Sequence, residues 1–168
     1  MMWVCRAGQK SIYAEYYFKT SKIYIPWDGF RHSLEDYKNR QELKELVKDE
    51  KGDVARTSIS NWSGQLFTFC YEMKVGDYVL IPFNHSRNYA FAKISGEYHF
   101  TEDAEYGLWH SKNIIILHNS IPNSIFNQSI RYSLGAYRTI FKARDEVEIL
   151  AVIKKHIAHR KEERCGFR

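Results

Sequence analysis

The sequence has few of the residues that build disulfide frameworks, metal sites or flexible linkers. It contains three cysteines, Cys5, Cys70 and Cys165, and no two of them have the spacing of a redox or metal-binding pair. Its three prolines form no Pro/Gly-rich linker, so we expect a single domain. Residues 1–145 would form its body, and a basic helix and tail, residues 146–168, would pack on the same domain.

Long apolar runs are also missing. No segment approaches the ~18 consecutive apolar residues needed to cross a membrane. The start, residues 1–6, lacks the basic and apolar regions of a signal peptide. The sequence therefore predicts a cytoplasmic protein with no membrane partner. A hydrophobic fraction of 44% and an aromatic fraction of 15% exclude a disordered chain.

The chain has almost no net charge outside its last fifteen residues. The formal net charge is +5, from 25 Lys and Arg against 20 Asp and Glu. Residues 154–168 supply six of the basic and two of the acidic residues, so the remainder is almost neutral. A nucleic-acid interface in the body must then be a local patch, with the basic tail as an additional electrostatic anchor.

Motifs of catalysis and cofactor binding are absent too. No nucleophile elbow, phosphate-binding loop, dinucleotide fingerprint or metalloprotease motif occurs. Glu72-Met73-Lys74 has the acid-x-lysine form of some nucleases, but no second carboxylate is placed to share a metal with it. His156 and His159 share a helix face without a third ligand. We therefore predict no catalytic residue, no metal and no cofactor.

Hydrophobic periodicity predicts short strands with helices inserted among them. Ser33 and Asp36 have the spacing of a capping box at the start of the first helix. No regular βαβ alternation occurs, so the expected class is α+β with a small mixed barrel as its core. The expected strands are residues 2–6, 22–27, 78–82, 89–94 (continued by 97–100), 114–117 and 137–142, and the expected helices are residues 33–50, 57–73, 122–134 and 144–160.

Aromatic residues are the unusual feature of the composition. Most of the four Trp, twelve Tyr and ten Phe must fill the core. Trp27 stands at a strand end, Tyr16 in a connecting segment and Trp109 in a loop that contains glycine. Aromatic side chains in such places are what a base-stacking pocket requires. For any single one of them, burial in the core is still the commoner outcome.

The end of the first strand offers a second candidate feature. Gly8 would let a ligand approach the backbone closely, and Arg6 beside it could hold a phosphate or a base edge. Arg87, in the loop of residues 83–88, could reach a groove of a duplex. A solvated surface charge is an equally good interpretation of Arg87.

Several motifs resemble the N-terminal domains of Mrr-like restriction-system proteins. Residues 3–8, WVCRAG, are similar to the W-v-v-R-A-G opening of those domains. Further similarities follow in order at residues 23–27, 40–43, 64–69, 74–79, 89–98 and 133–141. The resemblance implies a small mixed, partly closed PUA-like β-barrel with peripheral helices, as in EVE and YTH modules. It also implies a non-catalytic reader of nucleic acid that takes a modified base into an aromatic cage.

Three departures from the family pattern stand out. Pro26 occupies the place of a glycine just before Trp27, and Cys5 replaces an aliphatic residue. The chain has no nuclease half, so a role in restriction or phage defence requires a separate nuclease or a nucleotide-driven subunit as partner.

Our hypothesis is therefore a DNA-binding module that flips a base into a pocket at the barrel mouth. Phosphate contacts must supply most of the net affinity, because stacking gains about as much as unstacking the base costs. An RNA reader with the same barrel, and a protein-interaction or small-ligand module, remain alternatives. Trp27 would stack on the base, with Tyr16 or Trp109 as a second wall; Arg6, Gly8 and Asp28 would bond the base edge or a phosphate, and Lys19, Lys22, Arg31, Arg87 and the basic tail would contact phosphates.

Overall fold

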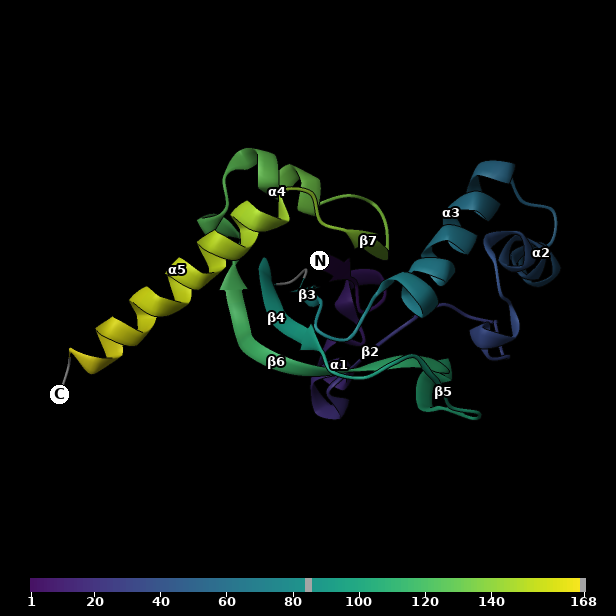
Figure 1. Ribbon diagram of the computed structural model, residues 1–168, viewed down its shortest axis with the longest axis horizontal. Coiled ribbons are helices and arrows are strands. Elements are labelled where there is room, and N and C mark those ends of the chain that lie inside the picture. Colours follow the sequence, from purple (N-terminus) through teal and green to yellow (C-terminus); the bar gives the residue numbers. More distant parts are fainter. Residues whose placement is uncertain (84–85, 167–168) are drawn as a thin grey trace.

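A computed structural model describes residues 1–83 and 86–166. Residues 84, 85, 167 and 168, which include part of the predicted 83–88 loop and the end of the predicted basic tail, lie outside the described residues. The described chain is α+β, with one mixed sheet that curls into a half-barrel (Figure 1). Its strands are β1 (Met2–Cys5), β2 (Lys22–Tyr24), β3 (Tyr78–Phe83), β4 (Asn88–Ile94), β5 (His99–Phe100), β6 (His110–Pro122) and β7 (Ile140–Lys142).

The sheet has the order β2-β6-β4-β3-β1-β7, and β5 also pairs with β6. The first strand, β1, lies between two strands from later in the chain. It pairs parallel with β3 and antiparallel with β7. Burial along β1 is complete, and its side chains alternate between the two faces of the sheet, as extended backbone requires.

The long strand β6 corrects the prediction of a short, fully apolar strand at residues 114–117. It has 13 residues and joins two parts of the sheet. Its first half pairs with β2 and β5, and its second half pairs with β4. The polar start of β6 is buried, and the Lys112 ammonium group donates a hydrogen bond to the Met73 carbonyl at 2.8 Å. Ile115 and Leu117, in contrast, are exposed.

Five α-helices surround the described sheet. The predicted helix over residues 33–50 is interrupted: Ser33 caps only a 3-10 turn, Leu34–Asp36, and the α-helix starts at Arg40. The Asn39 side chain accepts a hydrogen bond from the Glu42 amide, so Asn39 rather than Ser33 caps the α-helix. The helices are α1 (Ala14–Thr20), α2 (Arg40–Lys51), α3 (Arg56–Phe67), α4 (Gln128–Leu134) and α5 (Glu146–Cys165).

Three further helices differ from the sequence predictions. The predicted helix over residues 122–134 is a 3-10 turn, Asn123–Ile125, followed by α4, and Pro122 ends β6. The predicted helix over residues 57–73 is α3 followed by a π-helical turn, Thr68–Glu72. Tyr16, which was expected in a connecting segment, lies instead in α1, within the aromatic run of residues 16–18. There Tyr17 is fully buried, and its hydroxyl donates a hydrogen bond to the Tyr24 carbonyl at 3.0 Å. The run therefore fixes α1 against β2.

The two faces of the sheet support separate hydrophobic clusters. Trp3 and Cys5 of β1 belong to a cluster with residues of α1, α2 and α3. Met2 and Val4 belong to the other cluster, with residues of α4 and α5. Helix α5 contributes Ile149 and Ile153 to that second cluster, and its last turns extend away from the body (Figure 1). None of the helices in the described chain is long and apolar enough to span a membrane.

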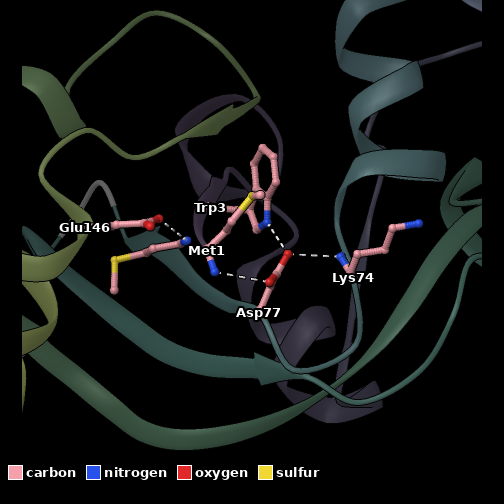
Figure 2. A network of polar contacts seen from close by, with 6 residues as sticks. Met1, Trp3, Lys74, Asp77 and Glu146 are labelled. Carbon is pink, nitrogen blue, oxygen red and sulfur yellow. Dashed lines mark hydrogen bonds and ion pairs between the residues drawn. The ribbon is translucent and has the colours of Figure 1, made fainter.

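A polar network joins the start of the chain to the turn before β3 (Figure 2). The Asp77 carboxylate accepts hydrogen bonds from the Trp3 indole N–H at 2.8 Å and from the Lys74 amide at 3.0 Å. It also pairs with the Met1 ammonium group at 3.2 Å. The Met2 amide donates to the Glu146 carboxylate at 2.9 Å, which connects β1 with the start of α5. These bonds fix the position of β1 along β3.

Candidate functional site

Two neighbouring grooves open on one side of the protein. The larger has a volume of about 1590 Å³ and lies between α3 with its π-helical turn and residues 131–144. In Figure 1 the loop before β7 reaches from the end of α4 towards α3. The smaller, of about 310 Å³, lies between the β3–β4 hairpin and the end of α4. Arg131 and Gly135 line both, so the end of α4 is the ridge between the grooves.

The linings of the two grooves are strongly basic. They include eight of the 25 Lys and Arg of the chain, and, among described residues, one of its 20 Asp and Glu. The rest of the chain therefore has more acidic than basic residues. The larger groove holds Arg40, Arg56, Arg131, Arg138, Lys142 and Arg144, and the smaller holds Arg6, Arg87 and Arg131.

The single acid in these linings, Glu72, is already engaged. It forms an ion pair with Arg40 at 2.8 Å and accepts a hydrogen bond from the Thr68 hydroxyl at 2.7 Å. Arg40 also lies over the Phe67 ring, 4.6 Å from its centroid. The other five basic side chains of the larger groove form no ion pair within residues 1–83 and 86–166. Their charge is available to an anionic ligand.

Two exposed tyrosines line the larger groove. Tyr132 is 87% exposed and Tyr137 is fully exposed, which makes them the most exposed aromatic residues of the described chain. Aromatic rings are normally at least partly buried. An exposed ring beside several arginines forms a platform on which a nucleic-acid base can stack.

The wall that includes Tyr137 is bonded to Gln65 of α3, which lines the same groove. The buried Gln65 side-chain oxygen accepts hydrogen bonds from the Thr139 amide at 3.0 Å and the Ile140 amide at 2.8 Å. Its amide nitrogen donates to the Asn61 side chain at 3.3 Å. One side chain thus joins the two walls of the larger groove across its base.

The predicted site residue Arg6 supports the same wall. Its Nε donates to the Arg138 carbonyl at 3.0 Å, and Nη2 donates to the carbonyls of Leu134 and Ala136 at 3.2 and 3.1 Å. The Arg6 backbone amide also donates to the Thr139 carbonyl at 2.8 Å. Partial burial lowers the pKa of the guanidinium group. Arg6 lines the smaller groove, which it shares with the predicted Arg87.

Glycine is required at position 8 by the local structure and not, as predicted, by the approach of a ligand. Its φ is +80°, and a Cβ atom there would lie 2.8 Å from the Tyr13 ring. The space beside Gly8 is therefore filled by Tyr13 and is not open to a ligand.

Trp27 and Asp28 lie outside the groove linings. The Trp27 indole N–H donates a hydrogen bond to the Thr139 hydroxyl at 3.2 Å, and its ring packs near Phe30. Asp28 is exposed, and its backbone carbonyl accepts a hydrogen bond from the Lys51 ammonium group at 3.0 Å. Trp27 therefore touches the back of the wall that carries Tyr137.

The three rings proposed as a cage do not contact one another. Tyr16 packs against Tyr24 and Tyr106, with ring centroids 5.6 and 5.1 Å apart. Trp109 has the Arg31 guanidinium 5.6 Å from its ring centroid. No ring contact within the described residues joins either of them to Trp27. The predicted phosphate contacts Lys19, Lys22 and Arg31 are not among the described residues that line the grooves.

Most residues that line the larger groove were not among the predicted site residues. Residues 131–138 read RYSLGAYR, with an Arg and Tyr pair on each side of Gly135. Paired arginines and tyrosines around a glycine were a signal that could have found this wall. The opposite wall, residues 56–72, gave no comparable signal.

A metal centre is not formed by the described residues, which contain no group of three or more His, Cys, Asp or Glu side chains able to hold an ion. His118 and His156 are near one another, with ring centroids 6.4 Å apart. His110 lies in the core, between the Tyr98 hydroxyl and the Phe30 carbonyl.

Comparison with protein families gives one match. A family model described as a domain of unknown function (DUF8426) matches residues 2–141. The match covers both walls of the larger groove, apart from Lys142 and Arg144. No curated protein matches the chain.

Proposed function

We propose a nucleic-acid-binding function for this chain, which belongs to the DUF8426 family of domains of unknown function. The observation that supports it is the concentration of basic residues in the two grooves of a chain whose remainder is slightly acidic. Phosphate groups are the anions that such a surface binds in a salt-dependent manner.

The larger groove suits a polymer better than a small molecule. Its volume of about 1590 Å³ exceeds the ~300–1,000 Å³ of ordinary small-molecule pockets. A nucleic-acid strand in this groove would place its phosphates near Arg56, Arg138 and Arg144, and a base against Tyr132 or Tyr137. Stacking on a tyrosine requires an unpaired base, from a single strand or from a base flipped out of a duplex.

DNA is the substrate we favour, with a modified base as the feature that is read. The sequence motifs that resemble Mrr-like restriction-system domains support this choice, as does the half-barrel sheet, which is consistent with a PUA-like barrel. In this proposal the chain has no catalytic role, and restriction or phage defence depends on a separate nuclease or nucleotide-driven subunit.

Arg6 and Trp27 then act as positioning residues. Both bond to the segment that carries Tyr137, Arg6 through the carbonyls of residues 134, 136 and 138 and Trp27 through Thr139. They keep this wall in place while the exposed side chains in front of it contact the ligand.

The test is the affinity of the purified chain for short DNA strands and duplexes at two salt concentrations. Tyr137→Ala should weaken binding by about fivefold or more if a base stacks there. Tyr106→Ala is the matched control, because Tyr106 is also exposed but packs against Tyr16, away from both grooves. This control should change the affinity by less than about twofold.

A large loss in Trp27→Ala and in Tyr16→Ala, with none in Tyr137→Ala, would instead favour the cage predicted from the sequence. Duplexes that carry N6-methyladenine, 5-methylcytosine or 5-hydroxymethylcytosine show whether a modification is read. Competition with RNA decides which nucleic acid is preferred. If neither DNA nor RNA binds, the proposed function is wrong and an interaction module replaces it.

A further inference from the structure

Arg6 is a half-buried cation without a carboxylate partner. Three of the N–H groups of its guanidinium are used by backbone carbonyls at the end of α4. Carbonyl dipoles orient the group and offset part of its charge, but they leave a net positive charge. Charges taken out of water are ordinarily paired, so Arg6 lacks the anion that its position calls for.

Arg6 is one of the residues that line the smaller groove. Its remaining terminal nitrogen, Nη1, makes no hydrogen bond within the described residues. Since the other two nitrogens are fixed by carbonyls, the direction of Nη1 is fixed as well. Planar N–H donors held in this way match the oxygen atoms of a phosphate.

Other donors line the same groove. Arg87 and Arg131 are exposed and form no ion pair within residues 1–83 and 86–166. The Asn123 amide oxygen accepts a hydrogen bond from the Tyr89 hydroxyl at 3.3 Å, so the side-chain nitrogen of Asn123 remains as a donor. The Asn123 backbone amide donates to the Arg87 carbonyl at 3.0 Å, which positions the Arg87 backbone beside the groove.

We propose that the smaller groove is a phosphate subsite, in which Arg6 is the fixed donor and Arg87 and Arg131 close around the anion. The identity of the ligand rests on the proposed function: it is a phosphate of the strand whose bases occupy the larger groove. Arg131 and Gly135 line both grooves. The strand would therefore cross the ridge at the end of α4 to reach this subsite.

The experiment measures how the affinity for a short single-stranded DNA depends on salt. Each phosphate contact contributes about 0.7 to the slope of log affinity against log salt for a single strand. Arg87→Gln should lower the slope by about this amount, because it keeps a polar side chain and removes the charge that makes one phosphate contact. Lys19→Gln is the control: Lys19 is exposed on α1, outside both linings, and its loss should leave the slope unchanged.

Strands with and without a 5′-phosphate distinguish the two sources of the anion. If the subsite holds a phosphate within the strand, the effect of Arg87→Gln is the same for both strands. If it holds a terminal phosphate, removal of that phosphate weakens wild-type binding and abolishes the effect of Arg87→Gln.

A second measurement separates this inference from the proposed function. In an NMR titration with inorganic phosphate, the Arg6 Nε–H signal should shift in the wild type and shift much less in Arg87→Gln. If the chain binds no nucleic acid but this shift occurs, the anion site stands while the proposed function fails. An unchanged slope in Arg87→Gln together with no phosphate-induced shift of Arg6 would overturn the subsite, whether or not nucleic acid binds.

Discussion

The indole N–H of Trp27 donates a hydrogen bond to the hydroxyl of Thr139, 3.2 Å away and 112 positions later in the chain. This bond joins the segment after β2 to the segment before β7. Arg6 and Gln65 bind backbone groups of the same segment, residues 134–140. Three separate parts of the chain thus fix one wall of the larger groove.

The Trp27–Thr139 bond should be measurable as a coupling energy. In a double-mutant cycle of Trp27→Phe and Thr139→Val, we expect a coupling of about 1 kcal/mol in the free energy of unfolding, the usual net value of one hydrogen bond. Denaturant unfolding of the four proteins measures it. Strictly additive effects would show that the two residues contribute independently.

Gln65 should contribute strongly to the stability of the fold. Gln65→Met keeps the size of the side chain but leaves two buried backbone amides without an acceptor. We expect a loss of about 3 kcal/mol in the free energy of unfolding. Gln41→Met on the exposed face of α2 is the control and should change it by less than about 0.5 kcal/mol. Equal effects of the two substitutions would contradict the role given to Gln65.

His110 should make stability depend on pH in a defined window. Burial lowers the pKa of His110 to about 4, from an ordinary value of 6.5. Its neutral ring is therefore preferred in the folded state. The resulting stability is complete above pH 6.5 and is lost as the pH falls towards 4. Between pH 6.5 and 5 the free energy of unfolding should fall by about 2 kcal/mol.

The matched variants for this test are His110→Phe and His99→Gln. His110→Phe removes the titrating group, so it should flatten the decrease over this window even though it lowers stability overall. His99 is exposed on β5, and its replacement should leave the decrease unchanged. Burial and the nearby His156 also lower the pKa of His118, which adds a smaller effect of the same sign. A wild-type curve that is flat between pH 6.5 and 5 would refute the assignment.

Asp77 should also make stability depend on pH, in a window below that of His110. Burial alone would raise its pKa, but hydrogen bonds from Trp3, Lys74 and the Met1 ammonium group outweigh burial and place the pKa below 3.8. Its stabilisation is therefore present above that value and is lost as the pH falls through the lowered pKa. At neutral pH, Asp77→Asn should reduce the free energy of unfolding by about 1–2 kcal/mol, since it removes charge-assisted hydrogen bonds.

Asp103→Asn is the control for Asp77→Asn. Asp103 is exposed and has a positive φ of 54° that asparagine also tolerates. Thermal unfolding at pH 7 and pH 3 should separate the two variants more at the higher pH than at the lower. A similar separation at both pH values would mean that the carboxylate charge of Asp77 is unimportant.

The elements predicted from the sequence are those in which the buried side chains are apolar. The strands at residues 2–6, 78–82 and 89–94 agree with β1, β3 and β4 within about one residue. The strand β6 was missed over most of its length because its buried start is polar. Lys112 is buried there through a hydrogen bond to the Met73 carbonyl, a tertiary contact that no local pattern contains. Helix α1 has only seven residues, too few for a clear period.

The candidate site was predicted less well, for a related reason. Arg6 and Trp27 were selected as contacts of a base or a phosphate, and in the structure each bonds to the segment whose exposed side chains include Tyr137 and Arg138. Which side of a wall faces solvent depends on how residues 56–72 pack against residues 131–144. Segments separated by about half the chain leave no periodic signal of that packing.

The position of β1 between β3 and β7 has a consequence for how the protein is made. Its parallel partner lies 75 or more residues downstream and its other partner later still. One edge of β1 must therefore stay unpaired until β3 has been synthesised, about halfway along the domain, and the other edge until nearly the whole domain has been synthesised. Sheets with such distant pairings fold slowly, and waiting edges invite wrong partners. We expect the newly synthesised chain to need a chaperone far more than the finished fold does.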